Sequence, residues 1–402
     1  MEIGDLYVRQ LSGLVSFKYL FPKKEAFDEK ADEGIFLPII ILIGDRHHSE
    51  DGRCEPCDEK EDCYLVESDT FLQTLNQIAD SVPVDFYTEH APKDEKRKKP
   101  PSKGVLFEKF IGKVDGCHQK KLRGTREYKC NFPNVRWHYS DTRLWTGQYE
   151  NELSVVNGSL DYLTQPTTDL SFGYRLLLSP LFQQFLFCLL EVNRGNLDNK
   201  KLAKQLSGIL KDSIRHNQRT SRVYKQLAKS KLDIGIEMYC YFSLEYHGVA
   251  SPTSTLRDIL PNVQLLPMVY NYIFGGEPLH QDYLEQCKML IQGILILWIK
   301  FTACLLDIYF LARMLKTPKD NINSYLTVAF FGTAHCESIA NYLTDNLRMY
   351  ELKYSTEEAD RCVRVNGNIN FNKDLEMYSK WRIIRQKITP YTNRLETERL
   401  GM

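Results

Sequence analysis

The sequence predicts an α/β protein with a mostly parallel central sheet flanked by helices, and with a long all-helical insertion before the last core strands. Two apolar runs, residues 37–43 and 325–331, have the composition of buried parallel strands, and a glycine follows each run. A strand-helix-strand order follows the first run, and long helical patterns fill residues 171–316. We therefore expect one elaborated domain, residues 1–402, with the helical insertion at 171–316.

Composition limits the classes of partner. The 402-residue chain is 43% hydrophobic, and its 52 Lys and Arg residues equal its 52 Asp and Glu residues. This balance argues against nucleic acid or an anionic membrane as the main partner. The N-terminal residues lack the pattern of a secretory signal, because charged side chains interrupt them at Glu2, Asp5, Arg9 and Lys18. We expect an intracellular protein.

The first core strand is preceded by a less regular segment. Residues 11–21 predict a strand or hairpin, and the charged residues 23–33 predict a surface loop. The strand at 37–43 then ends at Gly44, where a glycine permits a sharp turn. Asp45, His47 and His48 follow at the carboxyl end of the strand, where α/β proteins usually bind ligands.

The next two strands also end on polar residues. Residues 69–79 have helical spacing, and the strand at 82–88 ends on Glu89. A right-handed crossover would place Glu89 at the same sheet edge as His47. After a short helix at 107–114, a third strand at 135–139 leads to Asp141 and Arg143.

Residues 93–103 form a charged run that contains two consecutive prolines. We interpret this run as an exposed loop, although a nuclear or nucleic-acid signal is an alternative.

The insertion and the tail complete the predicted elements. Helices are expected at 174–192, 199–231 and 289–315. The last of these is long enough for a membrane span, but Gln292, Lys300, Asp307 and Arg313 interrupt it, which favours a buried core helix and no stable membrane span. A strand at 325–331, a helix at 336–347, a strand at 349–354 and a helix at 373–388 follow.

The polar residues at the strand ends define a candidate catalytic site. His47, His335 and Glu89 match the ligand set of a catalytic divalent metal that keeps an open water position, with Asp45 nearby. Without a metal, the same groups could act as general base and orienting acid in hydrolysis. The simpler alternative is that each histidine caps a loop through hydrogen bonds.

Three further residues are expected to support this site. His48 adjoins His47, and Arg143 could hold the carboxylate of Asp141 with two parallel hydrogen bonds in the shell around the catalytic groups.

The cysteines define a second candidate site. Cys54 and Cys57 form half of a zinc knuckle, and the other half could come from Cys63, Cys117, Cys130, His48 or His118. Structural zinc, disulfides or a redox role, and independent thiols all remain open. Five other cysteines lie in or beside helical patterns that favour buried thiols: Cys188, Cys240, Cys287, Cys304 and Cys362.

The two Gly-x-x-His motifs, Gly44 to His47 and Gly332 to His335, resemble those of the TraB/Tiki group and its relatives, the ChaN-like haem-binding proteins and the erythromycin esterases. The resemblance implies a hydrolase whose paired histidines fall on His47 and His335 and whose glutamate falls on Glu89. Tiki members are metal-dependent proteases with a signal peptide or membrane anchor, and this sequence shows neither pattern. The sequence does not indicate whether the substrate is a small molecule or a peptide.

Over most of its length the chain also resembles uncharacterised proteins of large DNA viruses. This likeness rests on the Gly-Asp-x-His-x-Ser opening at 44–49, the Cys-x-x-Cys motif at 54–57, and residues 138–143 and 307–314. It implies a viral protein of the host cytoplasm or the virion, with virion partners. The competing expectation is therefore a non-enzymatic viral or virion-associated protein that uses a former hydrolase fold as a scaffold or interaction module.

Overall fold

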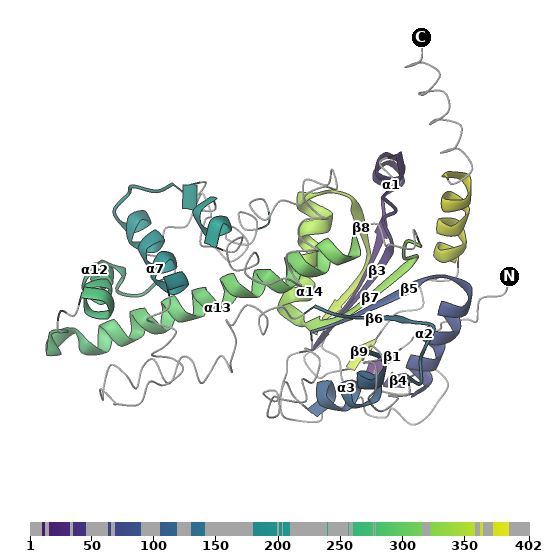
Figure 1. Ribbon diagram of the computed structural model, residues 1–402, viewed down its shortest axis with the longest axis horizontal. Coiled ribbons are helices and arrows are strands. Elements are labelled where there is room, and N and C mark those ends of the chain that lie inside the picture. The colour runs from purple at the N-terminus through teal and green to yellow at the C-terminus, as the bar shows by residue number, and fades with distance from the viewer. Residues whose placement is uncertain are drawn as a thin grey trace, which may run out of the picture. The chain divides into compact units, whose positions relative to one another are not determined.

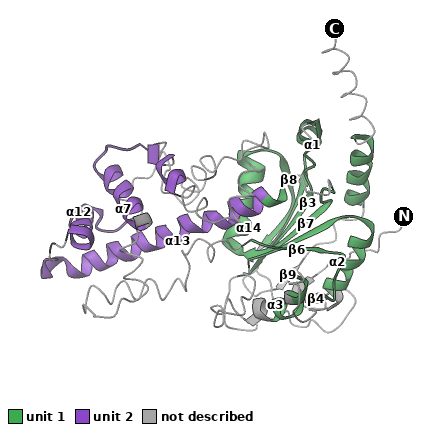
Figure 2. Ribbon diagram, viewed as in Figure 1, with its two compact units in different colours: residues 1–141, 313–402 green, residues 142–312 purple. Residues whose placement is uncertain are grey.

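The chain divides into two compact units, Met1–Asp141 with Arg313–Met402 (unit 1) and Thr142–Ala312 (unit 2) (Figure 2). The predicted arrangement of one domain with a helical insertion stays a prediction. The computed structural model describes residues 10–12, 16–32, 35–45, 63–65, 69–89, 105–118, 130–140, 180–198, 201–202, 204–209, 239, 256, 260–275, 277, 279–315, 322–357, 362–364 and 373–385. The charged run at 93–103 lies outside these residues.

Unit 1 contains a six-stranded sheet in the order β6-β5-β7-β3-β2-β8 (Figure 1). The strands in that order are Arg136–Tyr139, Val84–Thr88, Leu326–Gly332, Ile39–Asp45, Ser16–Pro22 and Tyr350–Glu357. Helices flank this sheet, as expected for an α/β protein, but the sheet is mixed, and the expectation of a mostly parallel sheet was wrong. β6, β5, β7 and β3 pair in parallel, whereas β2 is antiparallel to both β3 and β8. Strands buried on both faces have the same composition in either direction, so the sequence did not reveal this difference.

Two features of the N-terminal region also differ from the predictions. Residues 23–33 were expected to form a surface loop, but Lys24–Asp32 form helix α1, which buries Phe27 and Ala31 at a spacing of one helical turn. A second, three-stranded sheet has the order β4-β1-β9, from Cys63–Leu65, Gln10–Ser12 and Cys362–Arg364. Strands of this length are too short to produce a recognisable alternation.

Helices cover both faces of the six-stranded sheet. On one face, Phe110 of α3 (Val105–His118) contacts Phe86 and Phe330, with ring centroids 5.4 and 5.1 Å apart. On the other face, α14 (Thr333–Asn341) approaches β3 at Gly44 and continues as η4 (Tyr342–Asn346). Helix α2 (Asp69–Ser81) connects β4 to β5. Since both faces are covered, β2, β3, β5 and β7 are buried along their whole length.

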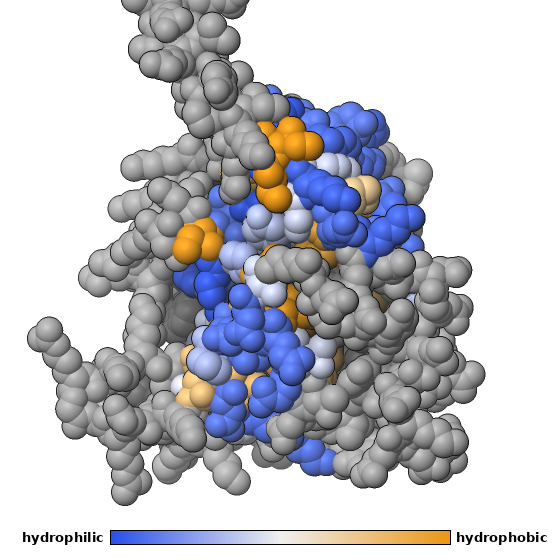
Figure 3. All heavy atoms as spheres, turned by 90° about the vertical axis from the view of Figure 1, so that its right-hand side faces the viewer, coloured by the Kyte–Doolittle hydropathy of each residue, from blue (hydrophilic) through white to orange (hydrophobic). Residues whose placement is uncertain are grey.

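The predicted tail helix is present at 373–385 and packs on β2. Tyr378 and Trp381 make edge contacts with Phe21 at 6.4 and 5.5 Å, and the Tyr378 hydroxyl donates a hydrogen bond to the Leu37 carbonyl. The guanidinium of the buried Arg382 lies 3.9 Å from the ring centroid of Tyr325. Among the described residues on the face shown in Figure 3, hydrophilic side chains predominate and hydrophobic ones form small, separate patches.

Every regular element described in unit 2 is helical, and α13 (Leu284–Met314) is the longest of them. In the core of unit 2, Trp298 of α13 makes edge contacts with Phe182 and Phe185 of α7 (Pro180–Asn193) at 5.5 and 5.1 Å. The segment Gln281–Met314 is long and apolar enough to cross a membrane, yet 61% of its apolar window is buried within the protein. The absence of a stable membrane span stays a prediction. Shorter helical segments of unit 2 are η1 (Val263–Leu265), α12 (Leu266–Tyr270), η2 (Asn271–Gly275) and η3 (Gln281–Tyr283), and α13 ends in unit 1.

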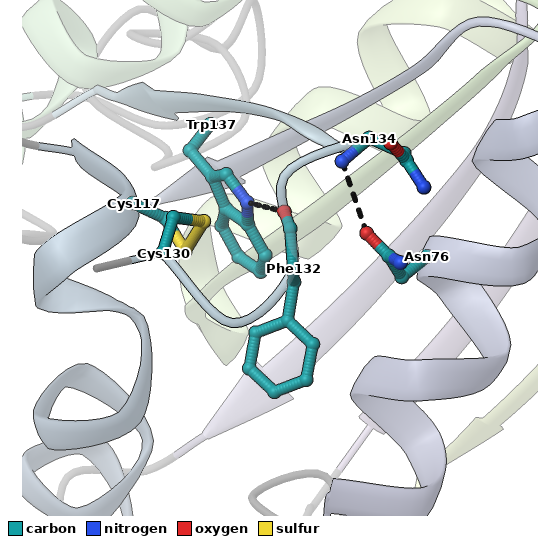
Figure 4. Close-up of a disulfide and its surroundings, with 6 residues drawn as sticks. All are labelled: Asn76, Cys117, Cys130, Phe132, Asn134 and Trp137. Carbon is teal, nitrogen blue, oxygen red and sulfur yellow. Dashed lines mark hydrogen bonds between the residues drawn. A yellow bond between two sulfur atoms is a disulfide. The ribbon is translucent and has the colours of Figure 1, made fainter.

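A disulfide joins Cys117, in the last turn of α3, to Cys130, before β6 (Figure 4). Hydrogen bonds hold the loop between Cys130 and β6, among them one from the Asn134 side chain to Asp80 of α2. The Trp137 indole donates to the Phe132 carbonyl at 3.0 Å, and the Asn134 backbone N–H donates to the Asn76 side chain of α2 at 3.0 Å. The disulfide removes Cys117 and Cys130 from any zinc site, whereas Cys54, Cys57 and the side chain of Cys63 lie outside the described residues.

Replacing Cys117 with serine is expected to lower the free energy of unfolding by about 2–4 kcal/mol, because the disulfide reduces the freedom of the unfolded chain between α3 and β6. Urea denaturation of oxidised wild type and the variant measures this loss. Cys287→Ser is the control, because Cys287 is a buried free thiol in unit 2. Wild type treated with reductant should match Cys117→Ser, and equal stability of oxidised and reduced wild type would contradict the prediction.

Candidate functional site

Glu89 is fixed at the junction between β7 and α14. It directly follows β5, the residue is 3% exposed, and its Oε2 accepts a hydrogen bond from the backbone N–H of Gly332 at 2.7 Å. Its own N–H donates to the Phe330 carbonyl at 3.2 Å. Negative charge is favourable at this position because Gly332 is the N-cap residue of α14.

His335 lies in the first turn of α14 and faces the second oxygen of Glu89. The His335 Nε2 atom is 3.8 Å from Glu89 Oε1, and the His335 residue is 8% exposed. This separation exceeds a direct hydrogen bond and is suited to a water or ion held between the two groups. The structure thus brings together two of the three residues predicted to form the catalytic centre.

Gly44 serves a different purpose from the one expected. It lies within β3 and not in a sharp turn, and a Cβ atom there would lie 2.1 Å from the Ser16 hydroxyl and 3.1 Å from the Thr333 Cα. A glycine is therefore required because β2 and α14 approach β3 closely. Asp45 follows Gly44, is buried, and pairs in register with Gly332, so Asp45 and Glu89 approach Gly332 from opposite neighbouring strands.

The other predicted site residues, His47, His48, Asp141 and Arg143, lie outside the described residues, so their convergence on this edge stays a prediction. Among the residues that the structure describes, no three His, Cys, Asp or Glu side chains are grouped as a metal site would need. Glu89 and His335 supply one oxygen and one nitrogen, which are suitable ligands but only part of a ligand set.

Comparison with known proteins adds no assignment: no family model, no curated protein and no solved structure matches this chain.

Sequence reasoning missed a partly buried polar network on β5 and β6. Asp85 accepts hydrogen bonds from His138 Nε2 at 2.9 Å and from Arg136 Nη2 at 3.0 Å, and Arg136 Nε lies 2.6 Å from the same carboxylate. The other ring nitrogen of His138, Nδ1, lies 2.9 Å from Arg313 Nη2 at the end of α13. Arg136 and His138 alternate with Trp137 on one strand, and this polar alternation was the available signal.

The network fixes the charge state of His138. An arginine can only donate, so Nδ1 must accept from Arg313 and Nε2 must carry the proton that Asp85 accepts. Burial lowers the pKa of His138 below 6.5 and outweighs the opposing hydrogen bond to Asp85. Burial alone would raise the pKa of Asp85, but hydrogen bonds from His138 and Arg136 bring it below 3.8. With both ring nitrogens engaged, His138 is suited to holding β5, β6 and the end of α13 together and not to proton transfer.

Proposed function

We propose that this protein is a hydrolase whose chemistry takes place at the carboxyl edge of the sheet, with His335 and Glu89 as the central pair. The observation that supports it is the convergence of a buried carboxylate and an imidazole from distant parts of the chain. His335 would accept a proton from the attacking water, and Glu89 would stabilise the resulting imidazolium. The bond from Gly332 holds the Glu89 carboxylate in place for this task.

The same pair would also serve a metal-dependent hydrolase. Glu89 and His335 would then be ligands together with His47, and a bound divalent ion would supply an activated water. The resemblance of the two Gly-x-x-His motifs to the TraB/Tiki and erythromycin-esterase group supports hydrolysis of a small molecule or a peptide.

The test is a screen of ester, peptide and phosphate-ester substrates, with and without added Zn²⁺, Mn²⁺ or Mg²⁺. His335→Ala and Glu89→Gln are each expected to lower kcat/KM by about 10²–10⁴-fold, the usual contribution of a positioned acid or base. A glutamine at position 89 can still accept the Gly332 N–H through its amide oxygen, so the junction should stay folded. His280→Ala is the matched control, because His280 is exposed and lies in unit 2.

Two outcomes would count against the proposal. One is full activity of both variants, which would exclude the pair from catalysis; a lowered melting temperature in these active variants would then assign it a helix-capping role. The other is a wild type that hydrolyses no substrate of the three classes and carries no metal by elemental analysis. That result would favour the alternative of a scaffold or virion-associated protein that retains the fold without the chemistry.

A further inference from the structure

One row of side chains along helix α13 is exposed. No described residue of unit 2 covers this row. We call this row the outer stripe: Glu285, Met289, Gln292, Ile296 and Lys300. The spacing of three or four residues puts all five on one side of the helix. Met289 is 53% and Ile296 43% exposed, which is high for large apolar side chains in the middle of a long helix.

The opposite side of α13 accounts for its packing within unit 2. Trp298 and Phe301 contact Phe185 of α7 at 5.1 and 5.5 Å. On the flank of the helix, Gly293 lets α13 approach Leu260 closely. The outer stripe is therefore no part of this core, and its apolar centre needs another explanation.

The order of residues along the outer stripe is self-complementary. A two-fold axis perpendicular to the helix, passing between Gln292 and Gly293, would bring Met289 against Ile296 of a second copy. The same axis would bring Glu285 against Lys300 at both ends. Glu285 already contacts Lys288 of its own helix at 2.5 Å, but exposed pairs of this kind are weak and leave the carboxylate available.

From this pattern we propose that a second copy of the chain docks on the outer stripe, with the two α13 helices antiparallel. Apolar contacts form the centre of the interface, and two Glu285–Lys300 pairs set its register and direction. The stripe is roughly 22 Å long at the rise of an α-helix, so the interface is small and the association depends on concentration. This inference does not rest on the proposed hydrolase activity.

Sedimentation velocity of the full chain over a range of concentrations, at low salt, tests the register. Glu285→Lys and Lys300→Glu should each weaken self-association by about ten-fold or more, because like charges then meet at both ends of the interface. An equimolar mixture of the two variants should restore wild-type association, because every lysine then faces a glutamate. The control is Lys201→Glu, a charge reversal at an exposed position of unit 2 outside the stripe.

Three results would overturn the proposal. The first is a wild type that stays monomeric at every concentration. The second is self-association that neither charge reversal weakens, or that the mixture fails to restore. The third is a monomer that binds phosphatidylcholine vesicles through the stripe, measured by loss of co-sedimentation in Met289→Glu, since the stripe would then be a membrane contact.

Discussion

Replacing Asp85 with alanine is expected to lower the free energy of unfolding by about 3–5 kcal/mol. The substitution removes the carboxylate that accepts hydrogen bonds from Arg136 and His138, so the charge of the Arg136 guanidinium loses its opposite charge in a partly buried position. Urea denaturation at pH 7, followed by circular dichroism, measures the loss. Asp85→Asn is the matched control, because its amide oxygen still accepts from His138 and the loss should be smaller.

The same network predicts how stability depends on pH. His138 has a lower pKa in the folded protein than its ordinary 6.5, so the unfolded chain binds a proton more readily below that pH. The contribution of neutral His138 to the free energy of unfolding is therefore fully present above pH 6.5. It declines below pH 6.5 and is lost as the pH falls through the lower, folded pKa. The depressed pKa of Asp85 adds a second decline below about pH 3.8.

His138→Gln separates the effect of His138 from other acid-sensitive groups. A glutamine can donate to Asp85 and accept from Arg313 without titrating, so the variant should lose less stability than wild type between pH 7 and pH 5. Identical pH profiles would show that His138 does not titrate as proposed.

For the Asp85→Ala variant, a loss below about 1 kcal/mol would mean that the network contributes no more than surface ion pairs do.

Trp298→Ala is expected to have an effect of similar size, about 3–5 kcal/mol, through a cavity in the core of unit 2. Trp298 is buried and contacts Phe182, Phe185 and Phe301. The matched variant is Trp381→Ala, which removes the indole that packs on Phe21 and Phe27 in unit 1. Differential scanning calorimetry of both variants measures which transition each change affects.

If the units unfold separately, each variant should lower the temperature of a different transition. A single shared transition would instead indicate one cooperative domain. A loss below about 1 kcal/mol for Trp298→Ala would contradict the packing described for unit 2.

The core strands and the main helices were readable from the sequence because their patterns are long and strongly apolar. The runs at 37–43 and 325–331 fall on β3 and β7, and the helical pattern at 289–315 falls on α13. The direction of β2 was not readable, because a strand buried on both faces shows no alternation and its partners are set by tertiary packing. The three-residue strands of the smaller sheet were missed for lack of any period.

The candidate site was readable in part. Glu89 and His335 could be paired because both follow strands that end at one edge of a parallel set. The Asp85–His138–Arg313 network was missed because its members come from two strand interiors and a helix end, and no spacing in the sequence connects them. Arg313 was noticed only as an interruption of an apolar helix, although it is the residue that fixes the tautomer of His138.

The place of β7 in the sheet has a consequence for how the protein is synthesised. β7 lies between β3 and β5, yet it follows the whole of unit 2 in the chain. While the ribosome translates unit 2, β3 and β5 have been made but each still lacks its shared neighbour, so backbone groups on both strands face no partner. Closure of the sheet must await a segment made much later, and during that interval the open edges of two apolar strands are exposed to association with other chains.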